Sequence, residues 1–137
     1  MKTLRIDDIE GLPVLGTLMW QPVRKPLGIT AFGINAYTAG SAGDEVVEDH
    51  TELVDEEVYV VIRGHATFTV DGEDVEAPAV TLVHVTDPKA ERVAIAKEDG
   101  TVVLSLGATH YDVDVIRCRA ERQGLVAQPV FKTGTPA

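Results

Sequence analysis

The sequence contains a single cysteine, Cys118, among 137 residues, so no disulfide can form within the chain. Proteins without disulfides are typical of reducing compartments, and we therefore expect a cytoplasmic protein. A lone cysteine in the C-terminal part of a chain is most often structural or incidental, and we assign Cys118 no chemistry.

Long apolar runs are also missing. The longest spans only a few residues, far short of the roughly 20 residues that cross a bilayer. The first eight residues include acids and no apolar core, which is unlike a signal peptide. The sequence therefore predicts neither a leader nor a membrane partner.

Basic residues are scarce relative to acidic ones. Lysine and arginine number 12 against 22 aspartates and glutamates, which gives a net charge of −10. Nucleic acids and anionic membranes repel such a surface, so we expect no nucleic-acid partner and instead a small molecule or another protein. The sequence also lacks a nucleophile elbow, a phosphate-binding glycine loop, zinc-type cysteine pairs and a calcium loop.

What the sequence does contain is a series of short β-rich runs separated by turn residues. Residues 58–62 are all β-branched or aromatic, which predicts a central strand covered on both faces. Asp71-Gly72 predicts a type I′ hairpin turn, since both residue types tolerate positive φ. The expected strands are 28–38, 46–50, 58–62, 65–70, 73–76, 80–85, 92–96 and 101–107. Short strands at this spacing predict an all-β sandwich or barrel.

The two ends of the chain differ from this middle part, although the length fits one domain. We expect residues 1–27 to form an N-terminal arm or lead-in strand and residues 28–112 to form the barrel. Residues 113–137 are expected to form a short helix and an extended tail, because apolar residues at helical spacing precede a segment with two prolines.

The most informative stretch runs from His50 to Gly64. It places His50, Glu52 and Glu57 just before an apolar strand, and strand alternation could turn these three side chains toward one enclosed space. Six residues separate Glu57 from Gly64, four separate Glu52 from Glu57, and one separates His50 from Glu52. This spacing resembles the first motif of the cupin superfamily, with Glu52 in the place of that motif's second histidine. Gly43 precedes His50 by one residue more than the motif asks.

A trace of the second cupin motif follows in the chain. Val80 stands where that motif begins with glycine, and Pro88 lies within its turn, but the motif's histidine is missing. Counting without gaps puts Glu91 in the histidine place, which is the alternative we favour, and a slip of one residue puts Arg92 there. The two alternatives differ chemically, because a carboxylate can bind a metal whereas a guanidinium repels one and pairs with a carboxylate.

The resemblance covers roughly residues 28–107 and implies a cupin jelly-roll β-barrel, often a homodimer, that encloses a small-molecule pocket. In metal-binding cupins, histidines and a glutamate hold a divalent ion inside the barrel. Members of the superfamily include dioxygenases, isomerases, decarboxylases and metal-free binders, so the fold does not specify a reaction.

Two functions remain open at this point. In the first, the metal site is degraded or absent and the barrel binds a small molecule, with Glu57 paired to an arginine such as Arg92. In the second, His50, Glu52 and Glu57 bind Fe, Mn, Ni or Zn in an oxygenase or isomerase, and Glu91 is a possible fourth ligand.

Three further side chains are candidates for the pocket. Tyr59 shares strand parity with Glu57 and could offer its hydroxyl to a ligand. His84 lies within a strand; it joins the pocket if it faces inward, and otherwise lies on the outer face or at a dimer interface. Asn35 either lines the pocket or faces solvent, because a buried amide needs hydrogen-bond partners.

Overall fold

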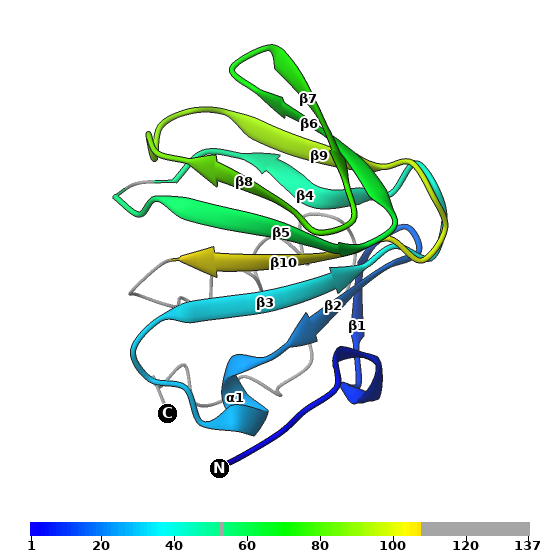
Figure 1. Ribbon diagram of the computed structural model, residues 1–137, viewed down its shortest axis with the longest axis vertical. Helices are drawn as coiled ribbons and strands as arrows, with labels where there is room; N and C mark the ends of the chain where they lie inside the picture. Colours follow the sequence, from blue (N-terminus) through cyan, green and yellow to red (C-terminus); the bar gives the residue numbers. More distant parts are fainter. Residues whose placement is uncertain (53, 108–137) are drawn as a thin grey trace.

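A computed structural model describes residues 1–52 and 54–107 of the chain. Two antiparallel sheets face each other across one core (Figure 1). The six-stranded sheet has the order β1-β2-β3-β10-β5-β8, and the four-stranded sheet has the order β4-β9-β6-β7. The elements are η1 (Ile6–Asp8), β1 (Leu12–Leu15), β2 (Leu18–Pro22), α1 (Arg24–Leu27), β3 (Gly33–Thr38), β4 (Glu45–His50), β5 (Glu57–Arg63), β6 (His65–Val70), β7 (Glu73–Pro78), β8 (Thr81–Val85), β9 (Arg92–Ala96) and β10 (Val102–Gly107). The prediction of an all-β fold is therefore confirmed.

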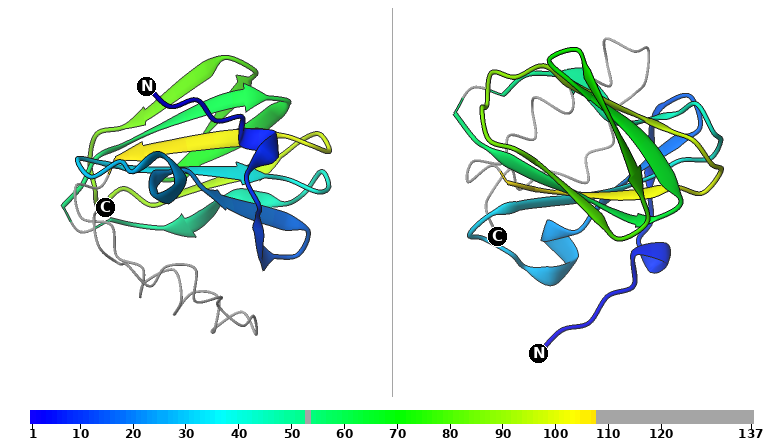
Figure 2. Two further views of the ribbon diagram at one scale, coloured as in Figure 1. Left: turned by 90° about the horizontal axis from the view of Figure 1, so that it is seen from below. Right: turned by 45° about the horizontal axis from the view of Figure 1, so that its top comes forward.

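The core lies between the two sheets, which curve toward each other in the views of Figure 2. Within it, the ring of Tyr59 from the six-stranded sheet packs against that of Phe68 from the four-stranded sheet, with ring centroids 5.6 Å apart and planes tilted by 46°. Valines and alanines from both sheets fill the remaining space, among them Val46, Val61 and Ala94, which are fully buried. Strand alternation explains this arrangement, because every second side chain of a strand points to the same face.

The predicted hairpin is present between β6 and β7. Asp71 and Gly72 have φ values of +47° and +80°, and Val70 lies directly opposite Glu73 across the turn. Positive φ at both central positions defines the type I′ turn, whose twist matches that of the flanking strands. The short sequence signal was sufficient here because the whole turn is local.

The first expected strand, 28–38, begins later than predicted. Gly28 ends helix α1 with φ +70°, a left-handed conformation that glycine adopts without steric cost. β3 therefore starts at Gly33, and the segment 1–27 supplies β1, β2 and the helix. No helix in the described residues is long and apolar enough to cross a membrane. The helix and tail expected over residues 113–137 lie outside the described residues.

The expectation that β5 is covered on both faces is wrong for the part of the molecule that the structure describes. Tyr59 and Val61 point into the core and are buried, whereas Val58 and Val60 are only half-buried on the opposite face and Ile62 is exposed. β5 pairs with β10 on one side and with the edge strand β8 on the other. The six-stranded sheet thus presents apolar side chains on its outer face as well.

Gly64, which links β5 to β6, is a conformational requirement of the fold. Its φ is +82°, and a Cβ built there would lie 2.8 Å from the Thr101 Cα. Gly72 has a similar φ of +80° but has open space around the same position. We predict that Gly64→Ala lowers the free energy of unfolding by about 3 kcal/mol, because strain and overlap add, whereas Gly72→Ala lowers it by about 1 kcal/mol.

Urea unfolding of the two variants at pH 7 measures both losses. Gly72→Ala serves as the matched control for backbone strain without overlap. Equal losses in the two variants would contradict the packing of Thr101 against Gly64.

Candidate functional site

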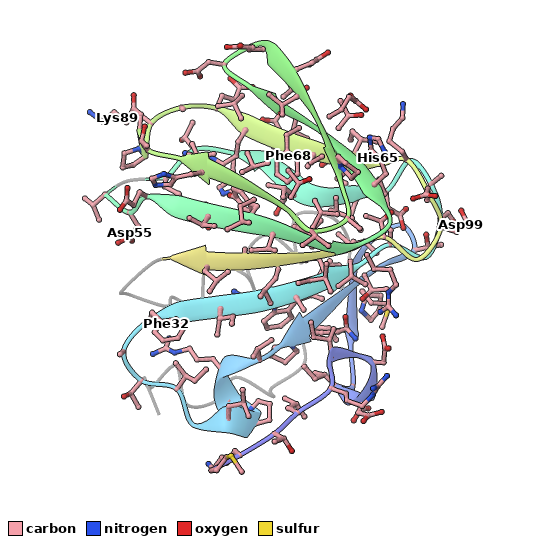
Figure 3. The ribbon with its side chains drawn as sticks, in the orientation of Figure 1. Phe32, Asp55, His65, Phe68, Lys89 and Asp99 are labelled. Carbon is pink, nitrogen blue, oxygen red and sulfur yellow. The ribbon has the colours of Figure 1, made fainter. Side chains whose placement is uncertain are left out.

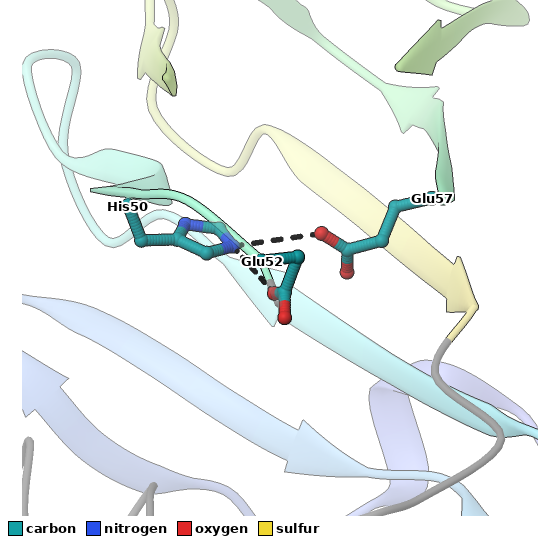
Figure 4. Close-up of side chains that lie close together, drawn as sticks. All are labelled: His50, Glu52 and Glu57. Atoms are coloured by element: carbon teal, nitrogen blue, oxygen red, sulfur yellow. Dashed lines mark hydrogen bonds and ion pairs between the residues drawn. The ribbon is translucent and has the colours of Figure 1, made fainter. Parts of the chain in front are cut away.

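Three side chains that could hold a metal ion meet at one end of the sandwich (Figure 4). His50 is the last residue of β4, Glu52 follows in the connecting segment, and Glu57 is the first residue of β5. The His50 Nε2 lies 2.9 Å from Glu52 Oε1 and 3.5 Å from Glu57 Oε1. The exposed fractions of the three side chains are 13%, 25% and 12% in that order. The group is therefore sheltered, and Glu52 is its most accessible member.

A hydrogen bond made by Nδ1 fixes the orientation of the His50 ring. Nδ1 makes a short hydrogen bond with the carbonyl oxygen of Glu48, and because a carbonyl only accepts, Nδ1 must be the donor. Nε2 then faces carboxylate oxygens of Glu52 and Glu57, which also only accept. The atom between them needs to be a proton on Nε2 or a cation bound to it. If both carboxylates are ionised and no cation is bound, both ring nitrogens of His50 carry protons.

Glu57 is the most heavily engaged carboxylate of the group. Its Oε1 accepts hydrogen bonds from the Tyr59 hydroxyl at 2.5 Å and from Arg92 Nη1 at 3.0 Å. Burial raises the pKa of the Glu57 carboxyl, but hydrogen bonds from His50 and Tyr59 and the charges of His50 and Arg92 outweigh it and hold the pKa below its usual value. Burial, together with the nearby Glu57 charge, raises the pKa of the Tyr59 hydroxyl, which therefore stays protonated as a donor.

Arg92 supplies the counter-charge to Glu57. Its side chain is 0% exposed, and its position directly opposite His50 in the β4–β9 ladder turns both side chains to the same face. The rest of the guanidinium donates to the backbone carbonyls of Asp87, Pro88 and Ala90, at distances between 2.7 and 3.1 Å. These acceptors satisfy a cation that burial would otherwise penalise by several kcal/mol.

The structure thereby decides between the two candidates for the missing histidine of the second motif. Arg92 points inward, whereas Glu91 is exposed and its backbone N–H donates to the Asp71 carboxylate. The alternative that we favoured from the sequence, Glu91 as a possible fourth ligand, is therefore replaced by Arg92. Counting without gaps misses Arg92 by one residue, and the pairing of β4 with β9, which places Arg92 opposite His50, is itself irregular.

Two other pocket candidates lie away from this group. His84 lies opposite Val58 in the β5–β8 ladder, on the outer face of the sheet, and its Nε2 is 3.0 Å from Glu56 Oε2. Asn35 accepts a hydrogen bond from Trp20 Nε1 at 2.8 Å, which ties β3 to β2. Of the predicted pocket residues, His50, Glu52, Glu57, Tyr59 and Arg92 are the ones that come together.

Gly107 also contributes to the site, although the sequence indicated only the end of a strand. It lies opposite Glu57 in the β5–β10 ladder, and a Cβ there would lie 3.0 Å from the Glu57 Cγ and 2.6 Å from the Glu56 carbonyl oxygen. The missing side chain leaves room for Glu57 to reach His50 and Arg92.

The geometry partly fits a divalent metal. One ligand atom from each of His50, Glu52 and Glu57 lies within 4.8 Å of the others, and cis ligands of a six-coordinate ion are separated by roughly 3 Å. A histidine whose other nitrogen donates to a carbonyl is also the usual arrangement in metal sites. Arg92 opposes this use, because it already neutralises Glu57 from a fully buried position.

Comparison with known proteins gives no match to any family model and none to any curated protein. Solved structures do match. A sugar phosphate isomerase of the cupin superfamily from Silicibacter pomeroyi DSS-3 is 16% identical, with a TM-score of 0.67 over 78% of this chain and 75% of that one. A predicted oxalate decarboxylase from Thermotoga maritima is 16% identical, with a TM-score of 0.62 over 77% of this chain and 97% of that one.

A third similar structure, a cupin protein from Bacteroides fragilis, is 21% identical and has a TM-score of 0.56 over 74% of this chain and 84% of that one. These identities are low, so the similarity concerns the fold and not the reaction. The proteins share the two-sheet architecture that the first motif and the strand series of this sequence predict. The chain has the fold of the cupin superfamily.

Proposed function

We propose that the chain is a small-molecule-binding cupin in which the guanidinium of Arg92 takes the place of a metal ion. The observation that supports this most directly is the fully buried Arg92 side chain, whose Nη1 lies 3.0 Å from Glu57 Oε1. The same oxygen also accepts a hydrogen bond from Tyr59. This oxygen of Glu57 is thus bound by two donors of the protein itself, the Tyr59 hydroxyl and the Arg92 guanidinium.

Charge balance supports the same proposal. With His50 as an imidazolium, the group holds two positive charges, on His50 and Arg92, and two negative charges, on Glu52 and Glu57. The sum is zero, which a sheltered site tolerates best. A divalent ion in place of the His50 proton would leave one excess positive charge beside a guanidinium that cannot move into solvent.

The site remains suited to a small polar ligand. Glu52 is the most exposed member, and a ligand that donates a hydrogen bond to it would reach His50 next. The names of two similar structures, a sugar phosphate isomerase and a predicted oxalate decarboxylase, describe enzymes that act on small polar molecules. These names support a ligand of that size and polarity, and they assign no reaction to this chain.

A second candidate function is a metal-dependent oxygenase or isomerase. The closeness of the three ligand atoms and the carbonyl-bound Nδ1 of His50 favour it. His50, Glu52 and Glu57 would hold Fe, Mn, Ni or Zn, and such an ion would supply Lewis-acid chemistry to a bound substrate. Arg92 would then keep one oxygen of Glu57 in place.

The metal content of the protein separates the two candidates. We predict that protein purified without chelator contains no stoichiometric transition metal by elemental analysis. We also expect added Mn²⁺ to leave the imidazole NMR signals of His50 unbroadened, because no ion occupies the space beside Nε2. A stoichiometric metal that is lost in His50→Ala, and retained in the surface control His65→Ala, would overturn the first proposal and support the second.

Replacing the guanidinium of Arg92 tests whether this residue is what prevents metal binding. We predict that Arg92→His binds Zn²⁺ or Ni²⁺ in calorimetric titrations where the wild-type protein shows no binding, because the buried cation is removed and a neutral nitrogen ligand is added. His50→Ala in the Arg92→His background should abolish this binding. Circular dichroism checks that each variant is folded, and equal binding by wild type and Arg92→His would contradict the proposal.

The Glu57 carboxyl makes stability depend on pH. Because its pKa in the folded protein lies below its ordinary value of 4.5, its contribution is fully present well above pH 4.5 and is lost as the pH falls through the lowered folded pKa. We predict that Glu57→Gln lowers the free energy of unfolding by about 3 kcal/mol at pH 7, since it leaves Arg92 buried without a counter-charge. The difference from wild type should shrink in acid.

Urea unfolding at pH 7, 5, 4 and 3 measures this difference. Glu91→Gln is the matched control, because the neighbouring Glu91 is exposed and should change stability little at any of these pH values. A Glu57→Gln loss that does not vary with pH would show that the ionic pairing with Arg92 is not its cause.

A further inference from the structure

A second polar surface faces the interior of the sandwich beside the Glu57 group, and Asn35 of β3 and Ser105 of β10 form it. Ser105 lies directly opposite Asn35 in the β3–β10 ladder and directly opposite Tyr59 in the β5–β10 ladder. Residues that pair across neighbouring strands point to the same face of a sheet. Because Tyr59 packs into the core, the side chains of Asn35 and Ser105 also face the interior.

The Ser105 hydroxyl is a sheltered polar group that makes no hydrogen bond within the part of the chain that the structure describes. The residue is only 8% exposed. Among the described residues, every side-chain nitrogen or oxygen that is fully shielded from solvent has a hydrogen-bond partner. The Ser105 oxygen has none, so it must border a space that solvent or a ligand can enter.

Asn35 offers a donor at the adjacent position. Its side-chain oxygen accepts a hydrogen bond from Trp20 Nε1 at 2.8 Å, and because an indole N–H only donates, the amide must have its oxygen on that side. The amide nitrogen with its two N–H groups lies on the other side, and it donates to no atom of the described residues. Asn35 and Ser105 thus present unused hydrogen-bonding groups side by side.

Between this pair and Glu57, strands β3 and β10 contribute no side chain. The next residues on the same face are Gly33 and Gly107, which lie opposite each other, and Gly107 also lies opposite Glu57. These glycines are at the end of the two strands that Phe32 marks in Figure 3. Glycine within a strand is typical of a place where a ligand approaches the backbone closely. Ser105 is a diagonal neighbour of Glu57, at a Cα separation of about 7–8 Å.

The charges of the site restrict what can bind across this gap. Arg92 pairs with Glu57, and His50 lies between Glu57 and Glu52, so each cation of the group already faces a carboxylate. The groups that remain for a ligand are the accessible carboxylate of Glu52 and the neutral amide and hydroxyl of the pair on β3 and β10. The net charge of −10 also repels an anion before it reaches the site.

We propose that the ligand of this site is an uncharged hydroxy compound with a carbonyl or second hydroxyl oxygen, and that Asn35 and Ser105 select it. A hydroxyl at one end donates to Glu52, and the oxygen at the other end accepts hydrogen bonds from the Asn35 amide and the Ser105 hydroxyl. The proposal rests on the ligand-binding function proposed above and adds to it the charge of the ligand and the residues that read it.

Saturation-transfer NMR with matched pairs of small probes tests the charge. Lactamide and lactate have nearly the same shape, but only lactate is an anion at neutral pH, and glycerol and glycerol phosphate form a second such pair. We expect the uncharged member of each pair to receive saturation from the wild-type protein at millimolar concentration, and the anionic member to receive none. An equal or stronger signal from the anions would overturn the proposed ligand class while leaving a small-molecule site.

Ser105→Ala distinguishes a ligand-binding hydroxyl from a structural one. Because the Ser105 oxygen bonds to nothing in the described residues, its removal should shift the melting temperature by no more than about 2 °C, while the loss of one hydrogen bond weakens lactamide binding about fivefold. Thr101→Val is the matched control, since Thr101 is fully buried but its hydroxyl donates to the Glu98 carbonyl oxygen at 2.8 Å. It should lower the melting temperature by about 5 °C and leave lactamide binding unchanged.

Asn35→Asp tests the amide donor. The carboxylate keeps an oxygen for Trp20 Nε1 but presents an acceptor where the amide presents a donor, so lactamide binding should fall at least about tenfold. Lactamide binding that neither Ser105→Ala nor Asn35→Asp weakens would overturn the proposal, and so would failure of both uncharged probes to bind the wild-type protein. Failure of the proposed function itself has a different signature, a stoichiometric metal held by His50, which elemental analysis detects without any probe.

Discussion

Arg92 carries a full positive charge in the interior of the protein, and the partners that this charge requires constrain everything around it. An ion taken out of water costs several kcal/mol unless hydrogen bonds and an opposite charge compensate it. Here the carbonyls of Asp87, Pro88 and Ala90 and the Glu57 carboxylate do so. One guanidinium thus holds the turn before β9, the start of β5 and the orientation of Glu57, which in turn faces His50.

The two departures from the cupin motifs, Glu52 and Arg92, offset each other in charge. Glu52 replaces a neutral imidazole by an anion, and Arg92 replaces another by a cation, so the pair of substitutions leaves the summed charge of the ligand set unchanged. Either change alone would leave a sheltered group with an uncompensated charge. With both substitutions present, Arg92 neutralises Glu57, and His50 lies between the carboxylates of Glu57 and Glu52. Each charge of the group therefore has an opposite charge beside it.

The same strands serve two separate purposes because side chains alternate between faces. In β5, Glu57, Tyr59 and Val61 face the interior, where they build the site and the core, while Val58 and Val60 face outward. A change on one face therefore need not disturb the other.

The sequence by itself determined the features that depend on local spacing. Alternating β-rich runs predicted the all-β fold, Asp71-Gly72 predicted the hairpin, and the spacing of His50, Glu52 and Glu57 predicted their meeting, since β4 and β5 are close in the chain. Only the tertiary structure decided between Glu91 and Arg92 and turned His84 outward. The physical reason is register: the pairing of β4 with β9 contains two irregularities, and a slip of one residue moves a side chain to the opposite face of a sheet.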